Sequence, residues 1–86
     1  MSMEHFHVLE VHSNRVWLHH TAPVWVREFS GQDIHIPTRY MAYKAVERVP
    51  EGRKPWTVNN VRVSPVCTTP GPAINAAIEA AGDKMK

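Results

Sequence analysis

The sequence predicts an α+β protein: an antiparallel β-meander of three to four strands followed by a helix, a strand and a C-terminal helix. Short β-branched and aromatic runs separated by turn residues fill the first half of the chain. After residue 37 the apolar spacing changes from the period of a strand to that of a helix. A length of 86 residues suits one small core, so residues 1–86 are interpreted as a single domain.

The first hairpin is predicted from two alternating segments, residues 5–11 and 15–21, around the turn residues 12–15. The expected register pairs Val11 with Val16, Leu9 with Leu18, and His7 with His20. It places four apolar side chains on one buried face and leaves a mixed surface on the other. Trp17 lies on that mixed face, either as part of the core or as an exposed docking anchor.

Two further strands are expected at residues 24–29 and 33–36, separated by a turn in which Gly31 is able to take a positive φ. A helix is predicted from Thr38 to about Val49, because apolar residues recur there at helical spacing: Met41, Ala42, Ala45, Val46 and Val49. Pro50 ends this helix.

The last third of the chain predicts a strand over residues 56–66 and a closing helix. Pro65 indicates an edge strand or the end of a strand. Pro72 suits the first turn of the helix, and Gly82 is a suitable stop. The helix carries a narrow apolar stripe of Ile74, Ala77, Ile78 and Ala81.

Composition and charge exclude several protein classes. With 43% hydrophobic and 21% charged residues the chain is not disordered, and no apolar run is long enough to span a membrane. No signal peptide is evident, so we expect a cytoplasmic protein without a membrane partner.

The single cysteine, Cys67, excludes an intrachain disulfide and is expected to be a buried or loop residue. Residues 1–43 have a net charge of −1 and residues 44–86 of +3.

The basic residues of the second half are interleaved with aromatic ones. Arginine, tyrosine and tryptophan are enriched at protein-binding hot spots, which indicates a docking surface. The same composition suits a nucleic-acid module that uses residues 39–62, with cations on phosphates and rings on bases. A solvated helix face is the third interpretation. The predicted partner-binding residues are Arg39, Tyr43, Lys44, Arg48, Arg53, Lys54 and Trp56.

Histidines at the start of the chain suggest a second kind of site. In the expected register His5, His7 and His20 share one patch, a ligand set that zinc or nickel accepts. Half-exposed imidazoles at a sheet margin are the simpler interpretation, and it is the one preferred here. No metal and no cofactor is therefore predicted.

No nucleophile elbow, phosphate loop or paired-carboxylate motif is present, so the chain is not expected to be an enzyme. The preferred function is a non-catalytic accessory or inhibitor protein that docks on a protein partner. Free strand edges also allow a homodimer by sheet extension. The length suits compact accessory proteins of phages and mobile elements.

Overall fold

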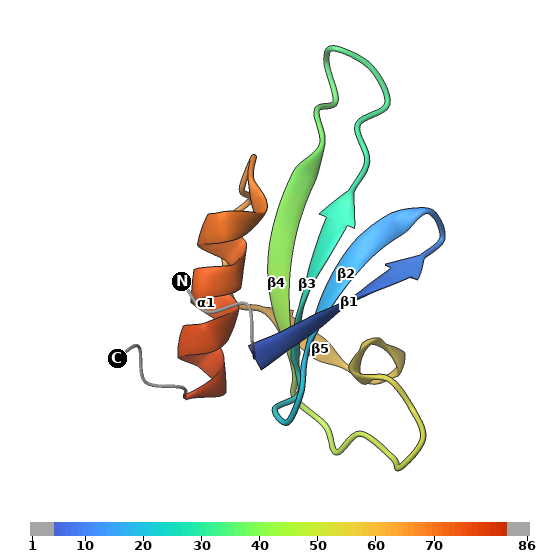
Figure 1. Cartoon of the computed structure of the whole chain (residues 1–86), viewed down its shortest axis with the longest axis vertical. Coiled ribbons are helices and arrows are strands. Elements are labelled where there is room, and N and C mark those ends of the chain that lie inside the picture. Colours follow the sequence, from blue (N-terminus) through green and yellow to red (C-terminus); the bar gives the residue numbers. More distant parts are fainter. Residues whose placement is uncertain (1–4, 83–86) are drawn as a thin grey trace.

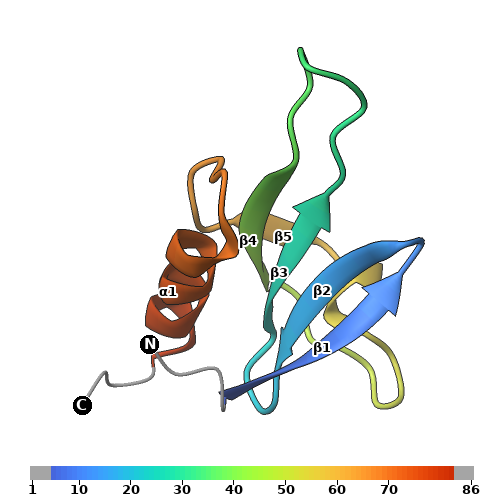
Figure 2. The ribbon, with the colours of Figure 1, turned by 45° about the horizontal axis from the view of Figure 1, so that its top comes forward.

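The computed structural model describes residues 5–82; residues 1–4 and 83–86 lie outside the described part. Its sheet has five antiparallel strands in the order β1-β2-β3-β4-β5, and one helix packs on one face (Figure 1, Figure 2). The α+β class is confirmed. The elements are β1 (Phe6–Val11), β2 (Asn14–His19), β3 (Val24–Phe29), β4 (Arg39–Ala45), the 3-10 turn η2 (Pro55–Thr57), β5 (Asn60–Arg62) and α1 (Pro70–Ala81).

The predicted first hairpin is present, with a tighter turn and a different register. The turn consists of His12 and Ser13, which both have a positive φ, 53° and 69°. Two such residues match the right-handed twist of the strands that they connect. The register is shifted by two residues from the expected one, so that Leu9 pairs with Val16 and not with Leu18. A shift of two leaves every side chain on its predicted face.

Strand β4 corrects the prediction of a helix over residues 38–49. It pairs with β3 from Lys44, opposite Val24, to Arg39, opposite Phe29, and with β5 on its other side. Alternate residues of β4 contact the two faces of the sheet, and both faces carry apolar side chains. Apolar residues therefore occupy adjacent positions and imitate a helical stripe, although the backbone is extended.

The predicted short strand at residues 33–36 is a turn instead. The carboxylate of Asp33 accepts hydrogen bonds from the amides of His35 (2.7 Å) and Ile36 (3.1 Å). Only one isolated bridge, between Asp33 and Ile36, remains of the expected strand. Gly31 does not use the positive φ that is open to it; a Cβ there would lie 2.7 Å from the carbonyl oxygen of Ile36. A glycine is thus required at position 31, because the backbone of residues 36–38 lies too close to leave room for a side chain.

Strand β5 is the edge strand that Pro65 indicated, but it spans three residues where eleven were expected. Beyond it the chain bulges at Ser64–Val66 and then pairs once more with β4 through a bridge between Tyr40 and Cys67. At the bulge the hydroxyl of Ser64 replaces a backbone carbonyl as acceptor, because it accepts a hydrogen bond from the amide of Ala42 (2.9 Å). A bulge and a proline at this edge discourage pairing with another strand.

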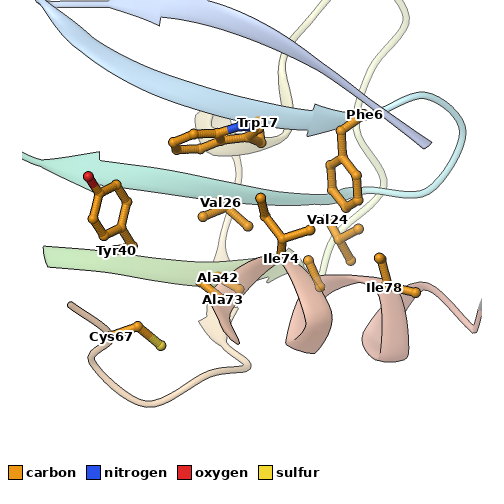
Figure 3. Close-up of a cluster of buried hydrophobic side chains, with 11 residues drawn as sticks. Phe6, Trp17, Val24, Val26, Tyr40, Ala42, Cys67, Ala73, Ile74 and Ile78 are labelled. Carbon is orange, nitrogen blue, oxygen red and sulfur yellow. The ribbon is translucent and has the colours of Figure 1, made fainter. Parts of the chain in front are cut away.

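Helix α1 covers one face of the sheet, across β3 and β4 (Figure 2). Ile74 and Ile78 point from the helix toward Val24 and Val26 of β3 (Figure 3). Trp17 lies in the same cluster and is only 4% exposed, so it is a core residue and not a surface anchor. Gly82 ends the helix in the left-handed conformation, as predicted. No helix within residues 5–82 is long and apolar enough to cross a membrane.

The opposite face of the sheet, here called the open face, has its own smaller cluster. Val16, Leu18 and Trp25 are buried there, with Tyr43 and Trp56 packed around them. Trp56 reaches this face from η2 and meets Trp25 edge to face, with ring centroids 5.4 Å apart. Apart from η2, no helix of the described chain packs on this face (Figure 1, Figure 2). Its margins are therefore available for contacts.

Candidate functional site

The predicted partner-binding residues do not form one surface; the structure divides them among three places. Because β4 is a strand, Tyr43 points to the open face, whereas Lys44 points to the helix face. The ammonium group of Lys44 donates to the carbonyl oxygen of Ala80 near the end of α1, at 3.3 Å, which gives Lys44 a structural role. Trp56 is half-buried against Trp25.

Around β3 and β4 the open face carries an arginine–aromatic cluster, defined as Arg27, Phe29, Arg39, Met41, Tyr43 and Arg62. The ring of Phe29 is contacted by two guanidinium groups, that of Arg27 at 5.1 Å and that of Arg39 at 5.6 Å from its centroid. Such cation–π contacts hold planar cations against an aromatic face. Arg27, Phe29 and Met41 were not among the predicted site residues. Arg27 and Phe29 lie on β3, outside the basic segment 39–62, and the predicted helix placed Met41 on its apolar stripe.

The rest of this cluster joins β4 to β5. The thioether sulfur of Met41 lies 3.5 Å from an Nη1 of Arg62 and 3.7 Å from the hydroxyl of Tyr43. The ring of Tyr43 stacks on Trp25, with centroids 4.7 Å apart. Within residues 5–82 none of the three guanidinium groups forms an ion pair with a carboxylate. The cluster therefore presents positive charge that the described chain does not neutralise.

A projecting loop, residues 30–38, connects β3 to β4 above this cluster and extends beyond the other elements (Figure 1). Ile34 is 90% exposed and Ile36 43% exposed. The loop is nonetheless ordered by internal bonds: Gln32 donates to the carbonyl oxygen of Ile36 (2.9 Å), and Gly31 donates to the hydroxyl of Thr38 (3.0 Å). The sequence had suggested a strand here and gave no sign that Ile34 would be exposed.

The opposite, helix face carries the ion pair of Arg15 and Glu28. A guanidinium Nη2 of Arg15 donates to Oε2 of Glu28 at 2.8 Å, and the hydroxyl of Tyr40 donates to the same oxygen at 3.0 Å. The hydrogen bond from Arg15 lowers the pKa of Glu28. Burial, followed by the neighbouring carboxylate, raises the pKa of Tyr40. These groups link β2, β3 and β4.

Three of the predicted residues, Arg48, Arg53 and Lys54, do come together. They line a pocket of about 350 Å³ at the end of the sheet where the β2–β3 turn meets the segment between β4 and η2. His19, His20, Thr21 and Glu47 complete its polar lining. The segments are far apart in the sequence, so only the predicted basic character of residues 48–54 pointed to this site.

The three predicted metal ligands do not come together as one group, although two of them, His7 and His20, are in contact. His5 stacks on His19, with ring centroids 5.8 Å apart, whereas His7 stacks on His20 at 5.2 Å. Nδ1 of His19 accepts hydrogen bonds from the amides of Thr21 (3.1 Å) and Ala22 (2.9 Å), so this ring holds the β2–β3 turn. Among the described residues no three His, Cys, Asp or Glu side chains are grouped closely enough to hold a metal.

Cys67 is buried beside the Ser64–Val66 bulge, as expected of a structural residue. Its thiol donates to the carbonyl oxygen of Pro65 at 3.2 Å. That position suits a small apolar residue that closes the end of the helix-side core (Figure 3).

Comparison of the chain with protein-family models, with curated proteins and with solved structures finds no match.

Proposed function

We propose that this chain is a non-catalytic accessory or inhibitor protein that docks on an acidic protein partner. The docking surface consists of the projecting loop and the arginine–aromatic cluster. The observation that carries the proposal is the 90% exposure of Ile34 in a loop that is held in shape by its own hydrogen bonds. A preformed apolar anchor loses little conformational entropy when it enters a partner's pocket.

Charge supports an acidic partner. Arg27 and Arg39 lie at the base of the projecting loop, on the strands that it connects, and Arg62 is exposed at the neighbouring edge. Positive charge around an apolar anchor favours a partner pocket rimmed by carboxylates, because complementary potentials speed association and exclude wrong partners. Asp33 is the acidic residue of the loop, and its carboxylate is occupied by two backbone amides.

A nucleic-acid function is less well supported by the same surface. Base stacking needs aromatic faces that are free. Phe29 already has guanidinium groups against its ring, and Tyr43 is stacked on Trp25. Ile34 would also have no role in binding phosphates or bases. The protein partner therefore remains the preferred interpretation.

Affinity capture from lysate with nuclease-treated and untreated halves tests the proposal, using wild type, Ile34→Ser and Arg39→Gln. A discrete protein that survives nuclease and is lost in both variants is the expected result. Val46→Ser is the matched control, because Val46 is also exposed (56%) but lies at the other end of β4. Equal loss in Val46→Ser, or capture that disappears with nuclease, would contradict the proposal.

A further inference from the structure

The pocket at the end of the sheet has a net positive lining and is separate from the proposed docking surface. Arg48, Arg53 and Lys54 contribute three positive charges, and Glu47 contributes one negative charge. The carboxylate of Glu47 accepts a hydrogen bond from the side-chain amide of Asn59. None of the three cations is in an ion pair within the described chain. An anion entering the pocket would therefore meet cations that retain their donors.

The rest of the lining has a polar part, formed by His19, His20 and Thr21, and an apolar part. The apolar part comprises Leu18, Ala22, Pro23, Val49 and Pro55, of which Leu18 and Pro55 are buried. A volume of about 350 Å³ falls in the range of small-molecule pockets, about 300–1,000 Å³. A cationic rim over an apolar floor fits a ligand with an anionic head and a short apolar body.

Hydrogen bonds fix the walls of the pocket before any ligand arrives. The carbonyl oxygen of Pro23 accepts from the amide of Ala45 (2.9 Å), and that of Pro55 accepts from the side chain of Asn60 (2.8 Å). The carbonyl oxygen of Lys54 accepts from both the amide and the hydroxyl of Thr57. A preformed site spends less of its binding energy on ordering its own segments.

We propose that this pocket binds a small phosphate monoester with an apolar substituent. Three cations against one carboxylate favour a dianion over a monocarboxylate. The two guanidinium groups have the planar donor arrangement that matches phosphate oxygens in pairs. Lys54 adds a point charge, and the floor excludes water from the substituent. The pocket therefore selects for a phosphate group and an apolar body together.

Nuclear magnetic resonance titration of the full chain, at constant ionic strength, tests this with four probes: phenyl phosphate, inorganic phosphate, benzoate and benzyl alcohol. Saturable shifts at the amides of Thr21, Ala22 and Lys54 are expected with phenyl phosphate. Inorganic phosphate and benzoate should bind more weakly, and neutral benzyl alcohol should not bind. Equal affinity for benzoate and phenyl phosphate, or no saturable shift with any probe, would overturn the proposal.

Charge-neutral variants locate the site. Arg48→Gln and Arg53→Gln should each weaken phenyl phosphate binding by between about 10- and 100-fold, the range expected for a lost charged hydrogen bond. Arg62→Gln is the matched control, because Arg62 is an exposed arginine outside the pocket. Unchanged amide spectra of the free variants establish that each is folded. Ile34→Ser should bind phenyl phosphate like wild type, which separates this site from the docking surface; equal weakening by Arg62→Gln would refute the assignment.

Discussion

The indole N–H of Trp25 donates a hydrogen bond of 2.9 Å to Oδ1 of Asn60, which lies 35 residues further along the chain. The side-chain amide nitrogen, Nδ2, of Asn60 in turn donates to the carbonyl oxygens of Pro55 (2.8 Å) and Val58 (2.9 Å). One side chain therefore joins β3, η2 and the edge strand β5. Since the Trp25 residue is only 5% exposed, water cannot readily replace this acceptor.

Replacement of Asn60 by alanine should lower the free energy of unfolding by about 1–3 kcal/mol, the cost of leaving buried polar groups without partners. Chemical denaturation of the wild type and variant measures this difference. Asn59→Ala is the matched control, since Asn59 is exposed and should change stability by no more than about 0.5 kcal/mol. Equal effects of the two substitutions would contradict the role assigned to Asn60.

The Glu28 carboxylate makes stability depend on pH. Its pKa is lowered from the usual 4.5, chiefly by the hydrogen bond from Arg15. A carboxylate with a lowered folded-state pKa stabilises the fold fully above its unfolded pKa, and this contribution is lost as pH falls through the folded-state pKa. Wild type should therefore lose stability more steeply than Glu28→Gln below about pH 4.5 in urea denaturation. Glu51→Gln, at an exposed turn, should retain the wild-type slope; parallel curves for wild type and Glu28→Gln would contradict the prediction.

Tyr40 produces the opposite dependence at alkaline pH. Burial, with a further contribution from the Glu28 carboxylate, raises its pKa above the usual 10. A raised folded-state pKa gives stability that is complete below the unfolded pKa and lost as pH rises through the folded-state value. Tyr40→Phe should remove this alkaline loss of stability, which denaturation of wild type and variant at increasing pH measures. Identical alkaline denaturation curves for wild type and Tyr40→Phe would count against it.

Ser13→Gly should stabilise the β1–β2 hairpin. Ser13 has a φ of 69°, which is a left-handed conformation. This conformation costs a residue with a side chain about 1–2 kcal/mol more than it costs glycine. Part of that gain is offset because glycine is more flexible in the unfolded chain, so we expect a net increase of about 0.5–1 kcal/mol. Thermal unfolding measures it. Ser30→Gly, where φ is not positive, should give no such increase.

Gly31→Ala should distort the base of the projecting loop. The added Cβ would lie 2.7 Å from the carbonyl oxygen of Ile36 and 2.8 Å from the amide nitrogen of Thr38, and neither backbone atom can move without opening the loop. We expect a loss of about 1–3 kcal/mol, as for other overpacked sites. Gln32→Ala, at an exposed neighbouring position, is the control. Amide exchange at Ile36, whose amide donates to Asp33, should accelerate in Gly31→Ala alone.

Local signals account for the parts of the fold that could be predicted. The β1–β2 hairpin and α1 were recognised because turn residues and Gly82 mark their ends within a few positions. Strand β4 was wrongly predicted because its apolar pattern reflects burial on two faces, which depends on α1 and on Trp25. Trp17 could not be placed from the hairpin alone, since the helix that covers it begins more than fifty residues later.

The same error explains what was missed in the candidate site. A helix over residues 38–49 would have grouped Tyr43 with Lys44, but a strand turns neighbouring side chains to opposite faces. The basic character of residues 48–54 was readable, whereas the pocket that they line depends on a contact with residues 18–23. The exposure of Ile34 depends on how far the projecting loop extends, which no local pattern encodes.

Every strand of this sheet precedes its covering helix in the sequence. Each strand pairs with the next one in the sequence, so the meander can form hairpin by hairpin as the chain leaves the ribosome. Phe6, Trp17 and Val26 then form an uncovered apolar surface until residues 70–81 emerge and dock. We therefore expect the protein to be most prone to aggregation, and most suited to binding by a chaperone, before this helix has docked.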